Sequence, residues 1–221
     1  MIYVLIAIVL FAALSFIVSR QNDNSETSTL DQHRVEIIAT QIIETSMQLK
    51  QGVDQMLYGG TDPDNLDFVT PDTEPAFSAG TTHINKIFHP SGGGIVLQPL
   101  PSGSTNQVSN DPPAQWYIGR FVNIEWTSSA EEEVIMTAHQ LTRQVCEAIN
   151  LRLLGNAAPL VTTANPRDIL VDDSLHGGAN PVEWTTALCT SCENVIAACV
   201  QGPSEVPGAN VYSFYSIVLS R

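Results

Sequence analysis

The chain opens on the run MIYVLIAIVLFAALSFIVS, in which no side chain carries a charge before Arg20. A helix rises about 1.5 Å per residue, so this run spans roughly 28 Å, close to the hydrocarbon thickness of a bilayer. A cleaved secretion signal is disfavoured, because it would show a basic start, a shorter apolar run and a small-residue cleavage site. The run is therefore interpreted as a membrane helix or as the packed core of an assembly.

A polar joint over residues 20–29 follows this run. Its Asn, Asp, Ser and Thr side chains compete for backbone hydrogen bonds, which makes them poor helix formers. We expect this joint to be non-helical or frayed once the chain is assembled.

Residues 30–59 predict an amphipathic helix, because apolar residues recur there at steps of three and four. Thr27 or Ser28 can cap its start, and the pair Gly59-Gly60 can end it. We accordingly divide the chain into an N-terminal helix over residues 1–59 and a globular head over residues 60–221. The apolar positions of the amphipathic half are Val35, Ile38, Ile42, Leu49, Val53 and Met56.

The charge balance argues against two classes of partner. Acidic residues number 23 against 9 basic ones, which gives a formal net charge of −14. Nucleic acid needs a basic face for its phosphates, and anionic lipid attracts polybasic patches, so neither is an expected partner of the head. An acidic surface of this kind chiefly favours solubility or repulsion between neighbours.

The four cysteines, Cys146, Cys189, Cys192 and Cys199, all lie in the last third of the chain. An even number of cysteines that follow an N-terminus typical of exported proteins indicates disulfides formed in an oxidising compartment. A zinc site is less favoured, because it would bring a second CxxC or paired histidines. Haem attachment is excluded, since Glu193 stands where a CxxCH motif needs histidine. Four cysteines allow three pairings, and the spacing alone leaves all of them open.

The head predicts an α+β fold with a mainly antiparallel sheet. Strands are expected over residues 92–100, 115–129 and 210–221. The segment EEEVIMTAHQL is expected to continue the sheet, and the alternative is that its Glu-rich start opens a helix. One short helix is expected over residues 142–155, with Thr142 as its cap and Gly155 as its stop.

Motifs for catalysis or metal binding are weak. Asp62, Asp64 and Asp67 are calcium candidates, but their spacing differs from an EF-hand loop and a solvated turn is favoured. The five histidines form no HExxH pair, although His83 and His89 stand six apart beside Lys86. The sequence also lacks a GxSxG elbow and a GK[ST] phosphate loop. We therefore expect neither an enzyme nor a bound cofactor.

With these features together, the chain resembles type IV pilins and pseudopilins. Met1–Ser19 followed by Leu30–Gly59 resembles the long first helix of that family, and the Cys189–Cys199 region resembles its disulfide-stapled C-terminal region. The resemblance implies a helix whose apolar half lies in the inner membrane before assembly and afterwards forms the filament core. It also implies a β-sheet head outside that core.

One position departs from the family. Pilins usually carry Glu at the fifth mature position, where it pairs with a neighbour's N-terminal amine, and here that position is Leu5. If Met1 is the mature N-terminus, assembly rests on apolar packing instead. The residues expected to form the filament core are Ile2, Val4, Leu5, Ile8, Leu10, Phe11, Leu14, Phe16 and Ile17.

The resulting hypothesis is a structural subunit of an extracellular, type IV pilus-like filament of identical copies at the cell surface. Of the three pairings, we adopt Cys146 with Cys199 and Cys189 with Cys192, so that the short helix is tied to the last segment. The alternatives are a single-pass anchored periplasmic or surface binding protein, and a minor tip pseudopilin of a type II secretion system.

Overall fold

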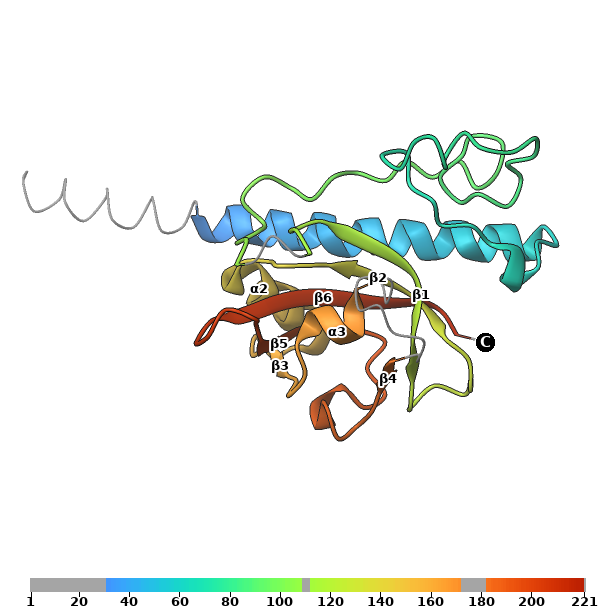
Figure 1. The fold of residues 1–221 in the computed structure, drawn as a ribbon. Helices are drawn as coiled ribbons and strands as arrows, with labels where there is room; N and C mark the ends of the chain where they lie inside the picture. Colours follow the sequence, from blue (N-terminus) through green and yellow to red (C-terminus); the bar gives the residue numbers. More distant parts are fainter. Residues whose placement is uncertain (1–30, 109–111, 172–181, 221) are drawn as a thin grey trace, which may run out of the picture.

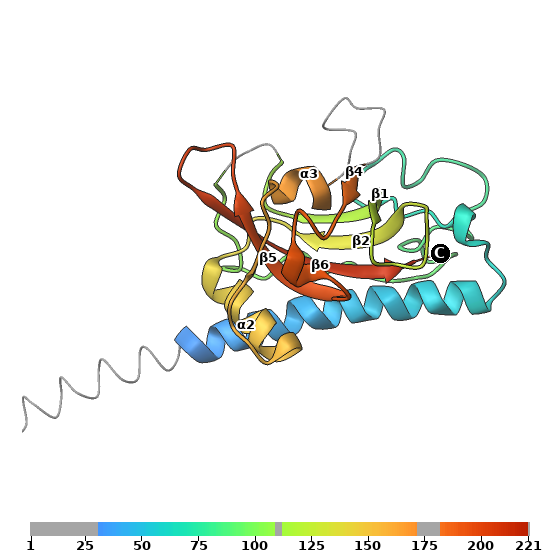
Figure 2. The ribbon, with the colours of Figure 1, turned by 90° about the horizontal axis from the view of Figure 1, so that it is seen from below.

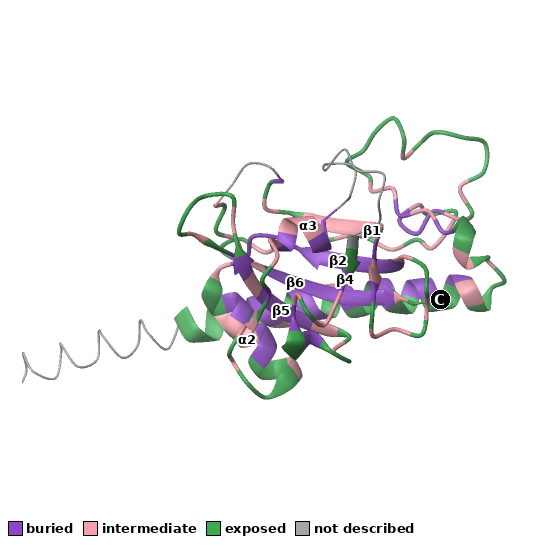
Figure 3. Cartoon of the chain, turned by 60° about the horizontal axis from the view of Figure 1, so that its bottom comes forward, coloured by how far each residue is buried: buried purple, intermediate pink, exposed green. Residues whose placement is uncertain are grey.

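The computed structural model describes residues 31–108, 112–171 and 182–220. A long helix over residues 31–58 lies along one face of a twisted sheet (Figure 1). The side of the helix that faces the sheet is buried, and its outer side is exposed (Figure 3). The expected apolar stripe explains this packing, because Ile38, Ile42 and Val53 are at most 5% exposed.

The sheet has six strands in the order β3-β5-β6-β2-β1-β4 among the described residues. Its four inner strands pair antiparallel, whereas β3 pairs parallel to β5 and β4 pairs parallel to β1. The strands are β1 Trp116–Ile124, β2 Glu133–Ala138, β3 Leu160–Val161, β4 Val182–Trp184, β5 Ala197–Pro203 and β6 Asn210–Leu219.

The pilin-like fold predicted from the sequence is wrong. The sheet is mixed: its four inner strands pair antiparallel, but long crossover connections bring β3 and β4 to the edges parallel to their neighbours. The helix found is the amphipathic one, residues 31–58. Within the described residues, no helix is both long and apolar enough to cross a bilayer. The predicted apolar half, the polar joint and the filament-core positions from Ile2 to Ile17 lie outside these residues.

Two shorter helices cover opposite faces of the sheet (Figure 2). Helix α2, Arg143–Leu154, packs beside the long helix, and its cap Thr142 and stop Gly155 are those that the sequence predicted. Helix α3, Pro166–Leu170, covers the other face and was not predicted. Its local signal was the Asn165-Pro166 pair, in which the Asn165 side chain accepts a hydrogen bond from the Arg167 amide.

Because helices lie on both faces, strand β2 is buried along its whole length. Val134 and Met136 pack under the long helix, whereas Ile135 belongs to the core beneath α3. A strand covered on both faces reads as a continuous apolar run rather than an alternating one. This explains why the segment EVIMTA lacks the period-two pattern of a half-exposed strand.

The segment between the long helix and β1 is anchored by cations that donate to backbone carbonyls. The Lys86 ammonium donates to the carbonyls of Ala76, Phe77 and Ala79 at 2.8–3.0 Å.

The strand predicted over residues 92–100 does not form. Instead, Ile95 packs against the long helix at Gly52, where a Cβ would lie 1.8 Å from the Ile95 Cδ1 atom.

Candidate functional site

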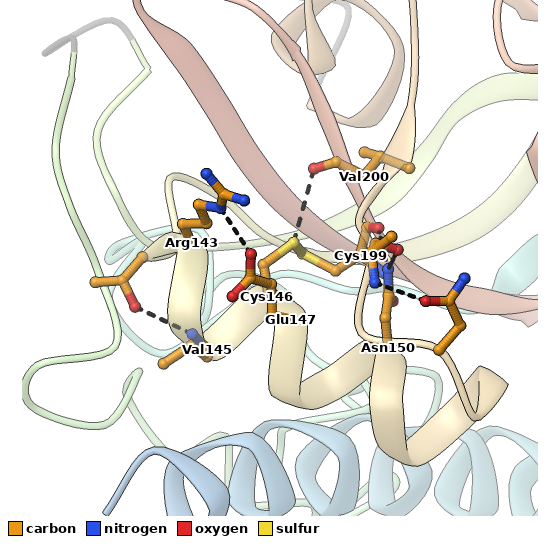
Figure 4. Close-up of polar contacts among 10 residues, drawn as sticks. Arg143, Val145, Cys146, Glu147, Asn150, Cys199 and Val200 are labelled. Atoms are coloured by element: carbon orange, nitrogen blue, oxygen red, sulfur yellow. Dashed lines mark hydrogen bonds and ion pairs between the residues drawn. A yellow bond between two sulfur atoms is a disulfide. The ribbon is translucent and has the colours of Figure 1, made fainter. Parts of the chain in front are cut away.

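Helix α2 is fixed to the sheet by a disulfide. Cys146 of α2 is bonded to Cys199 of β5, with their Cα atoms 5.3 Å apart (Figure 4). Both residues are fully buried. The structure also pairs Cys189 with Cys192, so it contains the pairing that the sequence analysis adopted.

Asn150, one turn further along α2, completes the edge of strand β5. Its side-chain oxygen accepts from the Cys199 amide at 2.7 Å, and its side-chain nitrogen donates to the Cys199 carbonyl at 2.8 Å. The same nitrogen lies 3.1 Å from the Ala158 carbonyl. A buried side-chain amide thus takes the place that a neighbouring strand would occupy, and it holds α2 at a set distance from the sheet.

The outer side of α2 and the start of the long helix enclose a groove of about 620 Å³, which we call the α2 groove. Its apolar lining includes Val35, Ala39 and Leu151, and the Leu151 side chain is 57% exposed. The complete lining is Asp31, Gln32, Val35, Glu36, Ala39, Gln144, Glu147, Ala148, Leu151, Arg152 and Ala157.

Charged side chains in and beside the groove are held by local contacts. Arg143 donates to Glu147 at 2.6 Å across one turn of α2. The Arg152 guanidinium donates to the Thr40 hydroxyl of the long helix, which joins the two walls. The groove therefore has a preset shape and offers apolar surface with acidic side chains beside it, a chemistry suited to binding.

Every lysine and arginine in the described part of the chain has an acceptor within the protein. The acceptors are carboxylates for Arg143 and Arg167, the Thr40 hydroxyl for Arg152, and backbone carbonyls for Arg34, Lys50, Lys86 and Arg120. Since the sequence carries 23 acidic residues against 9 basic ones, the surface that the head presents to a partner is predominantly acidic.

The calcium candidates are not gathered into a site. The Asp62 side chain accepts from the Asp64 amide, and the Asp67 side chain accepts from the Val69 amide, each at 2.9 Å. These two carboxylates therefore stabilise local turns. Within the described part of the chain, no group of three or more His, Cys, Asp or Glu side chains could hold a metal ion.

Two of the histidines that the sequence analysis named lie in contact. The rings of His83 and His89 stack with centroids 4.1 Å apart, and turns bring them together. Burial, His83 and Lys86 lower the pKa of His89. The nearby positive charge of Lys86 disfavours a second cation at this pair, so the stack is read as packing.

Buried polar pairs on the sheet are enclosed rather than open to a substrate. His139 lies with its Nδ1 atom 2.9 Å from the Ser213 hydroxyl, and these residues are 2% and 0% exposed. The Glu133 carboxylate accepts from the Ile124 amide at 2.8 Å, and burial raises its pKa. Neither pair can reach a reactant without unfolding the sheet around it.

Because His139 is buried, we expect the stability of the folded protein to fall in acid. Burial, followed by the charge of Arg167, lowers its pKa to about 4. Between that value and the unfolded pKa of about 6.5, the unfolded chain binds a proton that the folded chain does not. Stability is therefore lost as the pH falls through about 6.5, at up to about 1.4 kcal/mol per unit, or about 2 kcal/mol by pH 5.

Urea unfolding between pH 7 and pH 5 measures this loss. The variant His139→Asn is expected to flatten the dependence, whereas His33→Asn, at an exposed position of the long helix, should leave it unchanged. An unaltered slope in His139→Asn would contradict the assignment.

Of the residues that line the α2 groove, the sequence analysis named only Val35, as part of the apolar stripe of the long helix. Asn150, which holds α2 beside β5, left a weak signal as a polar residue beside the apolar stripe of a short helix.

Comparisons with protein-family models, with curated proteins and with solved structures found no match.

Proposed function

We propose that the chain is a structural subunit of an extracellular filament that assembles through its apolar N-terminal segment. The observation that carries the proposal is the uncharged run Met1–Ser19, placed ahead of a long helix that is packed rigidly onto the head. The apolar run has the length of a membrane helix, and burying it against other copies of the chain removes a large apolar surface from water or lipid.

The head supports an exported location. Its two disulfides are typical of oxidising compartments, and its acidic surface keeps separate heads soluble. The fold of the head does not support a filament role, because its mixed sheet differs from the pilin-like head predicted from the sequence. The support comes from the N-terminal run and from the helix that follows it.

Shuffling the apolar residues within positions 2–17 tests this proposal. The shuffled run keeps its composition, so membrane insertion is expected to be unchanged, whereas a packed bundle needs a particular side chain at each position. We expect filaments in negative-stain images of sheared surface material from the natural chain, and at least about tenfold fewer from the shuffled chain.

The second candidate is a single-pass anchored binding protein, which the α2 groove favours as a preformed concave site. For such a protein, the natural and shuffled chains would behave alike, and both would be recovered only as detergent-soluble monomers. That outcome would replace the filament proposal.

A further inference from the structure

The α2 groove combines three properties that together select its occupant. It exposes apolar side chains, it is bordered by carboxylates, and it lies where the long helix begins. We propose that the groove receives the apolar N-terminal run of a second copy of this chain, with Arg20 of that copy beside the acidic lining. The inference rests on the proposed filament function, which names no contact for the head.

The charges that line the groove indicate which occupant it can bind. Asp31, Glu36, Glu147 and Arg152 line the groove. Glu147 is paired with Arg143, and Arg152 donates to Thr40, so Asp31 and Glu36 leave the lining acidic and a second acidic head would be repelled from it. Residues 1–19 are free of charged side chains, and Arg20 follows them as the first Lys or Arg of the chain. An uncharged run that ends on a cation therefore complements an apolar groove that is bordered by carboxylates.

The walls of the groove are also held in place before an occupant binds. The Cys146–Cys199 disulfide and the Asn150 hydrogen bonds hold α2 against the sheet, and Arg152 joins α2 to Thr40 of the long helix. A wall that is already ordered loses little conformational entropy on binding. Its volume of about 620 Å³ accommodates the side chains on one face of a short helical stretch.

A second copy is favoured over the chain's own run. Asp31 itself lines the groove, so the chain's own run would have to reverse direction within residues 20–30 to enter it. Such a reversal would order the polar joint at an entropic cost, whereas a neighbouring copy supplies its run from outside without that turn.

Thiol crosslinking between two differently tagged full-length copies tests the contact. One copy carries Leu151→Cys, and the other carries Ile8→Cys, Leu14→Cys or Ile17→Cys, so that the register of the run is sampled. The native cysteines are in disulfides and at most 1% exposed, so a bismaleimide reacts with the introduced thiols. The matched control is Val161→Cys on strand β3, a position 63% exposed and outside the groove lining.

We expect a product that joins both tags, at a yield at least about tenfold above the Val161→Cys control. Placing the Leu151→Cys and Leu14→Cys changes in one chain separates the two sources of the run. A product confined to single chains would show that the groove holds its own run and would overturn the proposal. Equal yields from Leu151→Cys and Val161→Cys would overturn it as well.

Charge reversal provides an independent readout. Arg20→Glu is expected to lower the crosslinking yield several-fold, and combining it with Glu36→Arg is expected to restore most of the yield. If neither change alters the crosslinking yield, Arg20 does not take part in the contact. If filaments form but no crosslink does, this inference is wrong and the proposed filament function stands. If crosslinked dimers form but no filaments do, the contact with the groove stands and the proposed filament function is wrong.

Discussion

Asn150→Asp is expected to lower the free energy of unfolding by about 3–5 kcal/mol at pH 7, the cost typical of an uncompensated buried charge. The natural amide donates to the carbonyls of Cys199 and Ala158 and accepts from the Cys199 amide. A carboxylate keeps the accepted bond, but it has no proton to donate and faces two carbonyl oxygens in a fully buried site. The edge of β5 and the inner side of α2 are then held apart by repulsion.

Urea unfolding at pH 7 and pH 4 separates this explanation from a loss of packing. A protonated carboxyl can donate one hydrogen bond, so the destabilisation relative to the natural chain is expected to be smaller at pH 4. The matched control is Asn156→Asp, an exposed position where the side-chain oxygen accepts from the Ala158 amide. It should change stability by less than about 0.5 kcal/mol. Similar losses at both positions would refute the role assigned to Asn150.

Removing the Cys146–Cys199 disulfide is expected to cost about 4 kcal/mol, and removing the Cys189–Cys192 disulfide about 2 kcal/mol. The sequence separations are 53 and 3 residues, and the longer closed loop restricts the unfolded chain more. All four cysteines are buried to a similar degree, so the two double alanine variants differ chiefly in loop length. Each variant serves as the control for the other.

Urea unfolding without reductant measures this difference. We also expect the Cys146→Ala/Cys199→Ala variant to weaken crosslinking at the α2 groove, because α2 loses its covalent attachment to β5. The Cys189→Ala/Cys192→Ala variant lies on the opposite side of the sheet core and should leave crosslinking unchanged. Equal stability losses would show that loop length is not the deciding factor.

Elements whose signals are local were predictable. Helix α2 begins after Thr142 and ends at Gly155 because a capping hydroxyl and a left-handed glycine act within one turn of the residues they affect. Strand β6 was likewise predicted from its own residues, which are rich in β-branched and aromatic side chains and are buried over most of their length. The local signal for α3, a capping asparagine before proline, was present in the sequence, although α3 was not predicted.

Elements that depend on a distant partner were not predictable. Residues 92–100 have strand-like composition, yet they pass over Gly52 of the long helix, so they join no sheet. The directions of β3 and β4 depend on crossovers through the whole head, and these made the sheet mixed. β-Propensity measures how a residue suits a pleated, half-buried surface, and such a surface exists only after the chain has folded.

The sequence by itself determined the uncharged run ahead of Arg20, the amphipathic stripe of the long helix, the acidic balance and the presence of four cysteines. These properties follow from which side chains are present and how they repeat along the chain. Only the tertiary structure decided the order of the strands, the partnership of Asn150 with Cys199 and the groove between α2 and the long helix. The reason is that each of these features joins residues far apart in the chain, and their contact is set by packing rather than by local preference.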